Sequence, residues 1–242
     1  MRFGRRPISV LVLVGSSGVL LAASALTARP APTLPTEIPA AERDRLAAIT
    51  ETASLATFAA GEPFVARREV FEYLLDHPEF ATHVTRTLRV ARYRIWRASD
   101  GLWIDDGWGT VGRFSLVYAR DGTRVMHARG RYKQWFLPAI HGQAVVVIEY
   151  GAQPAVDGKS RISARVTGFV KLDNPLAELA NKFLSAAAEA KAEREARQLV
   201  KLFARTTRAI DNDPAGVHEL LRQRPDVPRR DLEEFRQLLQ LP

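Results

Sequence analysis

The 242-residue chain contains no cysteine. This absence excludes a disulfide framework, a thiol nucleophile and a thiolate metal site. It also excludes acylation of a signal-peptide cysteine. The folded part must therefore be stabilised by its core alone, and about 210 residues are enough for one domain with a sizeable core.

Runs of basic residues are missing too. The net charge is +8, but Arg2, Arg5 and Arg6 lie in the first 28 residues, which hold no acid, so a chain without that segment would carry +5. The other arginines are scattered among acids and do not cluster as nucleic-acid binding requires. We expect no nucleic-acid partner, and an anionic membrane surface is the more natural partner for this mild positive excess.

Common catalytic and metal-binding motifs are also absent. The chain has no HExxH zinc motif, no GxSxG nucleophile motif and no EF-hand loop. Residues 105–112 (DDGWGTVG) contain two acids and three glycines, but their spacing predicts a hairpin with a bulge that bends a sheet. The sequence therefore predicts no metal and no cofactor.

The N-terminus has the layout of an export signal. Three arginines precede an apolar run that ends among small residues, as in a secretory signal peptide spanning residues 1–28. The run of about 19 residues is also on the edge of the length that spans a bilayer. The sequence predicts a periplasmic or secreted protein, with an uncleaved anchor in the inner membrane as the alternative.

The rest of the chain divides into a linker, one domain and a helical extension. Residues 29–40 hold four prolines and predict a linker. The apolar spacing then predicts short helices at residues 41–56, 65–75 and 79–87. From residue 89 to 172 the period changes to two, with Asp-Gly turns between the segments, which predicts an antiparallel meander of about six strands.

A long helix is predicted to follow the strands over residues 176–210, and two short helices over 211–242. The fold class is therefore α+β, with one domain over residues 41–210. No helical stretch between the strands could make parallel crossovers, so a Rossmann-like nucleotide fold is excluded.

One face of the last predicted strand carries unusually small side chains. Ile162, Ala164, Val166, Gly168 and Val170 share that face, and small residues alternate with branched ones. A surface of this kind leaves volume over a sheet, which suits either a ligand or a closely approaching helix.

Residues 70–80 (VFEYLLDHPEF) resemble a segment of the START-like, helix-grip superfamily, which includes polyketide cyclases and Bet v 1-like proteins. Together with the element order, the resemblance covers about residues 58–208. It implies a curved sheet that grips a long C-terminal helix, with an apolar cavity between them. The first strand of that fold would have to come from residues 56–66, where Gly61 and Pro63 predict a short or absent strand.

These features favour a non-enzymatic binder or carrier of a lipid or other hydrophobic small molecule, with an arginine or histidine at the mouth of the cavity. The segment around Trp135, Phe136 and Leu137 is more apolar than a loop requires, which predicts contact with a membrane. The predicted cavity-lining residues are Val111, Met126, Ala128, Gly130, Val146, Ala164, Val166, Gly168, Leu179 and Phe183.

Acids and histidines in residues 76–83 suggest a second hypothesis. Asp76, His77, Glu79 and His83 could form a metal or acid–base site, but Pro78 separates them into two helices. Their simpler interpretation is that Asp76 and His77 end one helix and Asp76 caps the next. The alternative is a cyclase or hydrolase that uses His77 or His127 with Asp76.

A third hypothesis is a structural adaptor. The predicted long helix is rich in alanine and charge over residues 178–208, and its exposed portion could dock a partner protein. The sequence predicts neither the oligomeric state nor the identity of the ligand.

Overall fold

A computed structural model describes residues 34–107, 109–133, 139–173 and 175–242, without the side chains of residues 175–192 and Glu195. The predicted signal peptide or anchor lies outside the described residues. No described helix is long and apolar enough to span a membrane. The helices are α1 (Ala40–Glu51), α2 (Arg68–Asp76), α3 (Pro78–Thr87), α4 (Pro175–Asn212), α5 (Pro214–Arg222) and α6 (Arg229–Leu238), with a 3₁₀ turn at Val156–Gly158.

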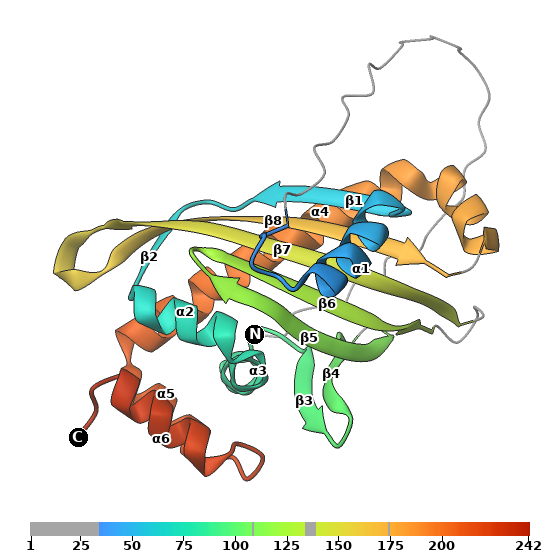
Figure 1. The fold of residues 1–242 in the computed structure, drawn as a ribbon. Coiled ribbons are helices and arrows are strands. Elements are labelled where there is room, and N and C mark those ends of the chain that lie inside the picture. Colours follow the sequence, from blue (N-terminus) through green and yellow to red (C-terminus); the bar gives the residue numbers. More distant parts are fainter. Residues whose placement is uncertain (1–33, 108, 134–138, 174) are drawn as a thin grey trace, which may run out of the picture. The chain divides into compact units, whose positions relative to one another are not determined.

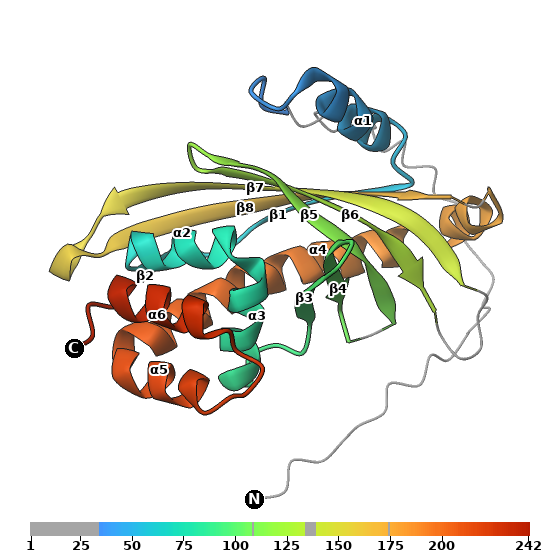
Figure 2. The same ribbon diagram turned by 60° about the horizontal axis from the view of Figure 1, so that its bottom comes forward.

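The strands form one curved antiparallel sheet, shown in Figure 2. Its order is β1-β8-β7-β6-β5-β4-β3, and β2 also pairs with β8. The predicted α+β class and antiparallel meander are confirmed. The strands are β1 (Leu55–Ala60), β2 (Phe64–Ala66), β3 (Arg94–Ala98), β4 (Gly101–Asp105), β5 (Thr110–Arg120), β6 (Thr123–Tyr132), β7 (Ile140–Pro154) and β8 (Ser160–Leu172).

The predicted Asp-Gly turns connect neighbouring strands, and the backbone angles of their residues explain why Asp and Gly occur there. At Asp121 and Gly122 the φ angles are +50° and +73°. A two-residue turn with positive φ at both positions matches the right-handed twist of the strands that it connects. Asp157 and Gly158, with φ of +57° and +68°, lie in the longer connection between Pro154 of β7 and Ser160 of β8.

The first strand is interrupted at Gly61 and Pro63, as predicted, but strand pairing continues on both sides of the break. Residues 56–66 form two strands, β1 and β2, which both pair with β8, so the sheet has eight strands rather than about six. Across the break at Gly61 and Pro63 the chain stays beside β8, where the amide of Gly61 donates a 3.0 Å hydrogen bond to the carbonyl of Ala164. Pairing with β8 therefore resumes beyond the local breakers. The preceding helix ends at Glu51 rather than residue 56.

The two faces of the sheet carry different helices (Figure 2). Helix α1 packs on one face, and α2 and α4 pack on the other. Leu34 and Ile38, from the segment predicted as a linker, are buried beside α1, so this part of the chain belongs to the core. The core on the α1 face consists of Leu34, Ile38, Leu46, Ile49, Val125, Val145, Val147 and Phe169.

The C-terminal helices share a core with α2 and α3. Pro78 separates α2 from α3, as predicted, and both helices present apolar residues at helical spacing. Helices α5 and α6 cover these residues, so residues 211–242 pack against the domain rather than projecting from it. The buried members include Val70, Leu74, Phe80, Val84, Ile210, Val217, Leu221, Leu232 and Phe235.

Helix α4 confirms the predicted long C-terminal helix. Its 38 residues are continuous and correspond to a length of about 57 Å. It packs on β1, β2 and β8, that is, on one side of the sheet (Figure 1). A Cβ atom placed on Gly61 would lie 2.2 Å from Cγ1 of Val200. The glycine therefore allows the helix to approach the broken strand closely.

Candidate functional site

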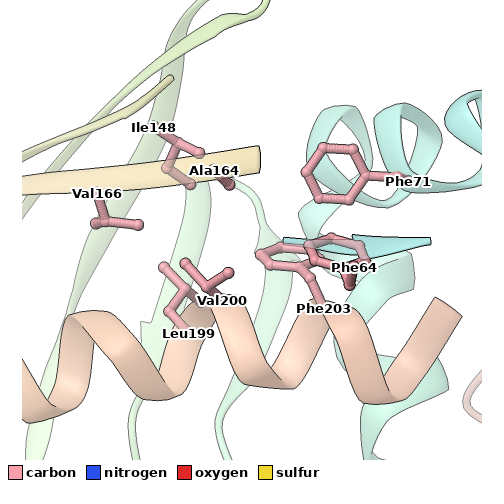
Figure 3. A pocket seen from close by; sticks show the side chains of 8 residues that line it. All are labelled: Phe64, Phe71, Ile148, Ala164, Val166, Leu199, Val200 and Phe203. Atoms are coloured by element: carbon pink, nitrogen blue, oxygen red, sulfur yellow. The ribbon is translucent and has the colours of Figure 1, made fainter. Parts of the chain in front are cut away.

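The space between the sheet and the second half of α4 is filled. Figure 3 shows eight apolar side chains from β2, α2, β7, β8 and α4 that point toward one another. The cavity that they leave is about 10 Å³, which is about the volume that one water molecule needs. The lining residues are Phe64, Phe71, Ile148, Ala164, Val166, Leu199, Val200 and Phe203.

Ala164 and Val166 were predicted to line a ligand cavity. This prediction is wrong, because the cavity that they face is too small for a ligand. Their small side chains accommodate α4, which was the second of the two uses considered for a small-residue face. The ring of Phe71 fills the remaining space, with edge contacts to Phe203 at 5.6 Å and to Tyr150 at 5.0 Å between centroids. We call this region the packed region.

The other part of the same sheet face is apolar but only partly buried. In one cross-strand row Leu102, Phe114, Ala128, Ala144 and Val170 lie directly opposite one another across β4 to β8. Every member of this row is partly exposed. Residues directly opposite in neighbouring strands share a face, so this row forms a continuous apolar surface.

A second row borders the first. Leu116, Met126 and Val146 are partly exposed and lie opposite one another on β5, β6 and β7, with the buried Gly168 next to them on β8. We call the surface formed by both rows the open face, and define it as Leu102, Phe114, Leu116, Met126, Ala128, Ala144, Val146 and Val170. Met126 and Val146 also pack against the core of the packed region, so they lie at its border.

Of the predicted cavity-lining residues, Met126, Ala128 and Val146 lie on the open face, and Gly130 and Gly168 lie beside it. Leu179 and Phe183 have side chains outside the described residues. Their part in ligand binding stays a prediction.

Val111 was also predicted to line the cavity under the helix, and this is wrong. It pairs with Arg131, whereas Gly130 pairs with Gly112. Because side chains alternate along a strand, Val111 lies on the α1 face of the sheet.

The acids and histidines of residues 76–83 do not converge on one point. Glu79 binds Arg97 at 2.9 Å, and His83 Nδ1 lies 3.6 Å from Asp226. The His77 ring stacks on Tyr73 at 4.1 Å between centroids. No group of three or more metal-ligating side chains gathers in the part of the chain that the structure describes.

Asp76 binds a buried arginine on the sheet. Arg124 Nε lies 2.5 Å from Oδ1 of Asp76, and Nη2 lies 3.1 Å from Oδ2. Only 5% of the Arg124 side chain is exposed, against 36% for Asp76. Burial alone would lower the pKa of Arg124, but the hydrogen bonds and charge of Asp76 raise it above its ordinary value. Asp76 therefore holds α2 to β6, and its predicted role as a cap of α3 is wrong, since α3 has no side-chain cap.

A tyrosine extends this ion pair. The guanidinium of Arg124 lies 5.5 Å from the centre of the Tyr150 ring, and the Tyr150 hydroxyl donates a 2.8 Å hydrogen bond to Glu72. Burial and the hydrogen bond with Glu72 raise the pKa of Tyr150 to about 12. The tyrosine is therefore neutral at pH 7. The four side chains fix α2 on the sheet and offer no free base.

His127 and Asp76 lie on opposite faces of the sheet. Arg124, the partner of Asp76, and His127 are three positions apart on β6, so their side chains point to opposite sides. His127 is buried, and its Nε2 lies 3.3 Å from the Gln143 side-chain oxygen. Burial, followed by the nearby charge of Arg45 on α1, lowers the pKa of His127. The hypothesis that pairs His127 with Asp76 is therefore wrong.

The predicted membrane-contacting residues Trp135, Phe136 and Leu137 lie outside the described residues, and that role stays a prediction.

Comparisons with known proteins give only distant structural likenesses. No family model matches the chain, and no curated protein matches it. Among the solved structures that match is the crystal structure of Ara h 8.0201, which is 15% identical. The alignment covers 65% of this chain and 99% of that chain, with a TM-score of 0.33. A likeness this low supports no functional inference, so the function is argued from the geometry alone.

Proposed function

We propose that the protein binds a lipid or other hydrophobic small molecule on the open face. The observation that carries the proposal is the partial exposure of eight apolar residues in two adjoining rows of the sheet. Exposed apolar residues are ordinary when scattered singly, but a contiguous patch marks an interaction site.

The packed region supports this assignment by contrast. The same sheet face is filled by α4 over β8, so the chain is able to close an apolar surface with its own side chains. The open face consists of the same kinds of residue and is left partly accessible. An apolar ligand that covers it would gain about 25 cal/mol for each Å² removed from water.

The protein acts as a binder or carrier rather than an enzyme. Asp76 is engaged by Arg124, and His127 is buried on the other face of the sheet. Asp76 and His127 therefore cannot act together on a ligand that is bound to the open face. The sequence of residues 1–28 supports export of this binder, with cleavage or membrane anchoring of that segment.

Nile red, an uncharged dye whose fluorescence rises in apolar surroundings, tests the proposal. We expect the dye to bind the purified protein and Ala128→Glu to weaken its binding by about tenfold or more, because a carboxylate would be desolvated beneath it. The matched control is Ala60→Glu, since Ala60 is exposed on β1, on the face opposite the buried Ala59.

Thermal unfolding must accompany the measurement. If Ala128→Glu does not fold, Ala144→Gln makes a milder polar change in the same cross-strand row. Equal dye binding by the wild type, the folded open-face variant and Ala60→Glu would contradict the proposal.

A further inference from the structure

The α1 face of the sheet carries a cleft at the end remote from the β5–β6 turn. It has a volume of about 740 Å³, within the range of about 300 to 1,000 Å³ typical of small-molecule sites. Its polar lining consists of Arg113, Arg129, Arg131, His141 and Asp173, with Trp103 as an aromatic wall. We call it the arginine cleft.

The register of the strands places these side chains on one face. Trp103 lies opposite Arg113, and Arg113 lies opposite Arg129, across β4, β5 and β6. In the neighbouring row Arg131 lies opposite His141. On β6, Arg129 and Arg131 continue the face of Val125 and His127, which is the α1 face. The cleft is therefore separated by the sheet from the open face.

One wall of the cleft is held in place by Asp100. Its carboxylate accepts hydrogen bonds from Arg113 at 2.6 and 3.1 Å and from the Trp103 indole at 2.8 Å. Trp103 also stacks on Trp96, with 6.4 Å between ring centres. Asp100 therefore orients the aromatic wall and balances the charge of Arg113.

The charges of Arg129 and Arg131 are not balanced by an ion pair of this kind. Neither arginine forms an ion pair with a described residue, and both are exposed. Within the lining only Asp173 carries a negative charge. Arg129 lies between Arg113, directly opposite on β5, and Arg131 on the same face of β6, and like charges this close repel one another; Asp100 offsets only the charge of Arg113. An anion in the cleft would relieve this repulsion.

We propose that the arginine cleft binds a phosphate group, carried by a soluble phosphate compound or by a phospholipid headgroup. The planar guanidinium donates paired hydrogen bonds to phosphate oxygens, and Arg129 and Arg131 outnumber the one acid of the lining, so the cleft keeps a net positive charge. Trp103 offers an apolar surface to the rest of the molecule. This site is distinct from the open face and does not depend on its function.

The test compares Arg129→Gln/Arg131→Gln with Arg161→Gln, which removes an exposed arginine of β8 outside the cleft. Inorganic phosphate is titrated against chloride at equal ionic strength, and binding is followed by calorimetry and by thermal unfolding. We expect the double variant to bind phosphate at least about tenfold more weakly than the wild type, because it loses charge-assisted hydrogen bonds. Arg161→Gln should bind it as the wild type does.

Vesicles distinguish the two sources of the phosphate. Sedimentation with phosphatidylglycerol vesicles that depends on Arg129 and Arg131, and is absent with phosphatidylcholine, indicates a lipid headgroup. Binding of inorganic phosphate without binding of vesicles indicates a soluble compound.

The double variant should be at least as stable as the wild type without phosphate, and its Nile red binding should not change. Absence of binding to both phosphate and vesicles would overturn the proposal. An equal loss of binding in Arg161→Gln would also overturn it.

Discussion

The packed region and the open face belong to the same side of one sheet, yet they differ in what covers them. In the packed region, Val200 and Phe203 of α4 meet Ala164 and Val166 and leave about 10 Å³. On the open face, Ala128 and similar residues remain partly exposed. A small apolar residue on a strand can therefore admit a helix or leave a surface accessible, and which of the two it does depends on where the helix lies.

The largest expected effect comes from removing a ring from the packed region. Phe71→Ala should lower the free energy of unfolding by about 3 to 5 kcal/mol, because Phe71 is buried against Phe64, Tyr150 and Phe203. The matched change on the open face, Phe114→Ala, should cost about 1 to 2 kcal/mol, since the ring is already partly exposed. Urea unfolding measures both. Equal losses would mean that the two regions are equally packed.

The close approach of α4 gives the second prediction. Gly61→Ala should cost about 2 to 3 kcal/mol, because the added methyl group would overlap Val200. The control is Gly151→Ala, where an added Cβ meets nothing within 4 Å. Combining Gly61→Ala with Val200→Ala should cost less than the sum of the two single changes. Strict additivity would show that the glycine is not needed for helix packing.

The ion pair between α2 and the sheet gives a smaller effect. Asp76→Asn should cost about 2 kcal/mol, because Arg124 would stay buried without a counter-charge, while the partial exposure of Asp76 softens the loss. Glu79→Gln is the control, since its partner Arg97 is 68% exposed and such pairs contribute about 0 to 1 kcal/mol. A similar loss of stability in both variants would show that the buried Asp76–Arg124 pair contributes no more than the exposed Glu79–Arg97 pair.

The smallest effect is a pH dependence that arises on the α1 face. Burial lowers the pKa of His127, so the folded protein binds this proton less readily than the unfolded chain. Stability from the neutral ring is therefore present above the unfolded pKa, about 6.5, and is lost as the pH falls below it. His127→Gln should weaken the dependence of the free energy of unfolding on pH between pH 7 and 6, as measured by urea unfolding. His141→Gln, at an exposed position, is the control, and an equal change in slope would contradict this assignment.

Much of the fold could be predicted because its signals are local. The period-two segments, the Asp-Gly turns and the break at Pro78 each depend on a few adjacent residues, and all are present in the structure. The first strand could not be predicted because its pairing with β8 joins residues about 100 positions apart. That pairing continues on both sides of the break at Gly61 and Pro63.

The site was predicted less well, for the same reason. Periodicity identified Met126, Ala128 and Gly130 as one face of a strand, but it could not show that α4 would fill the space at Ala164. The Asp76–Arg124 pair spans 48 residues and has no local signal. The sequence did contain one clue. Arg124 is two positions from Met126 and therefore shares its apolar face, and a charged residue on such a face requires a partner.

The most direct test of the central claim is photo-crosslinking with a diazirine-bearing fatty acid, followed by mass-spectrometric mapping of the labelled peptides. We predict labels at open-face residues such as Leu116, Met126 and Val146, and none at Ile148 or Val166 of the packed region. Labels confined to the α1 face, or none at all on the folded protein, would contradict the account.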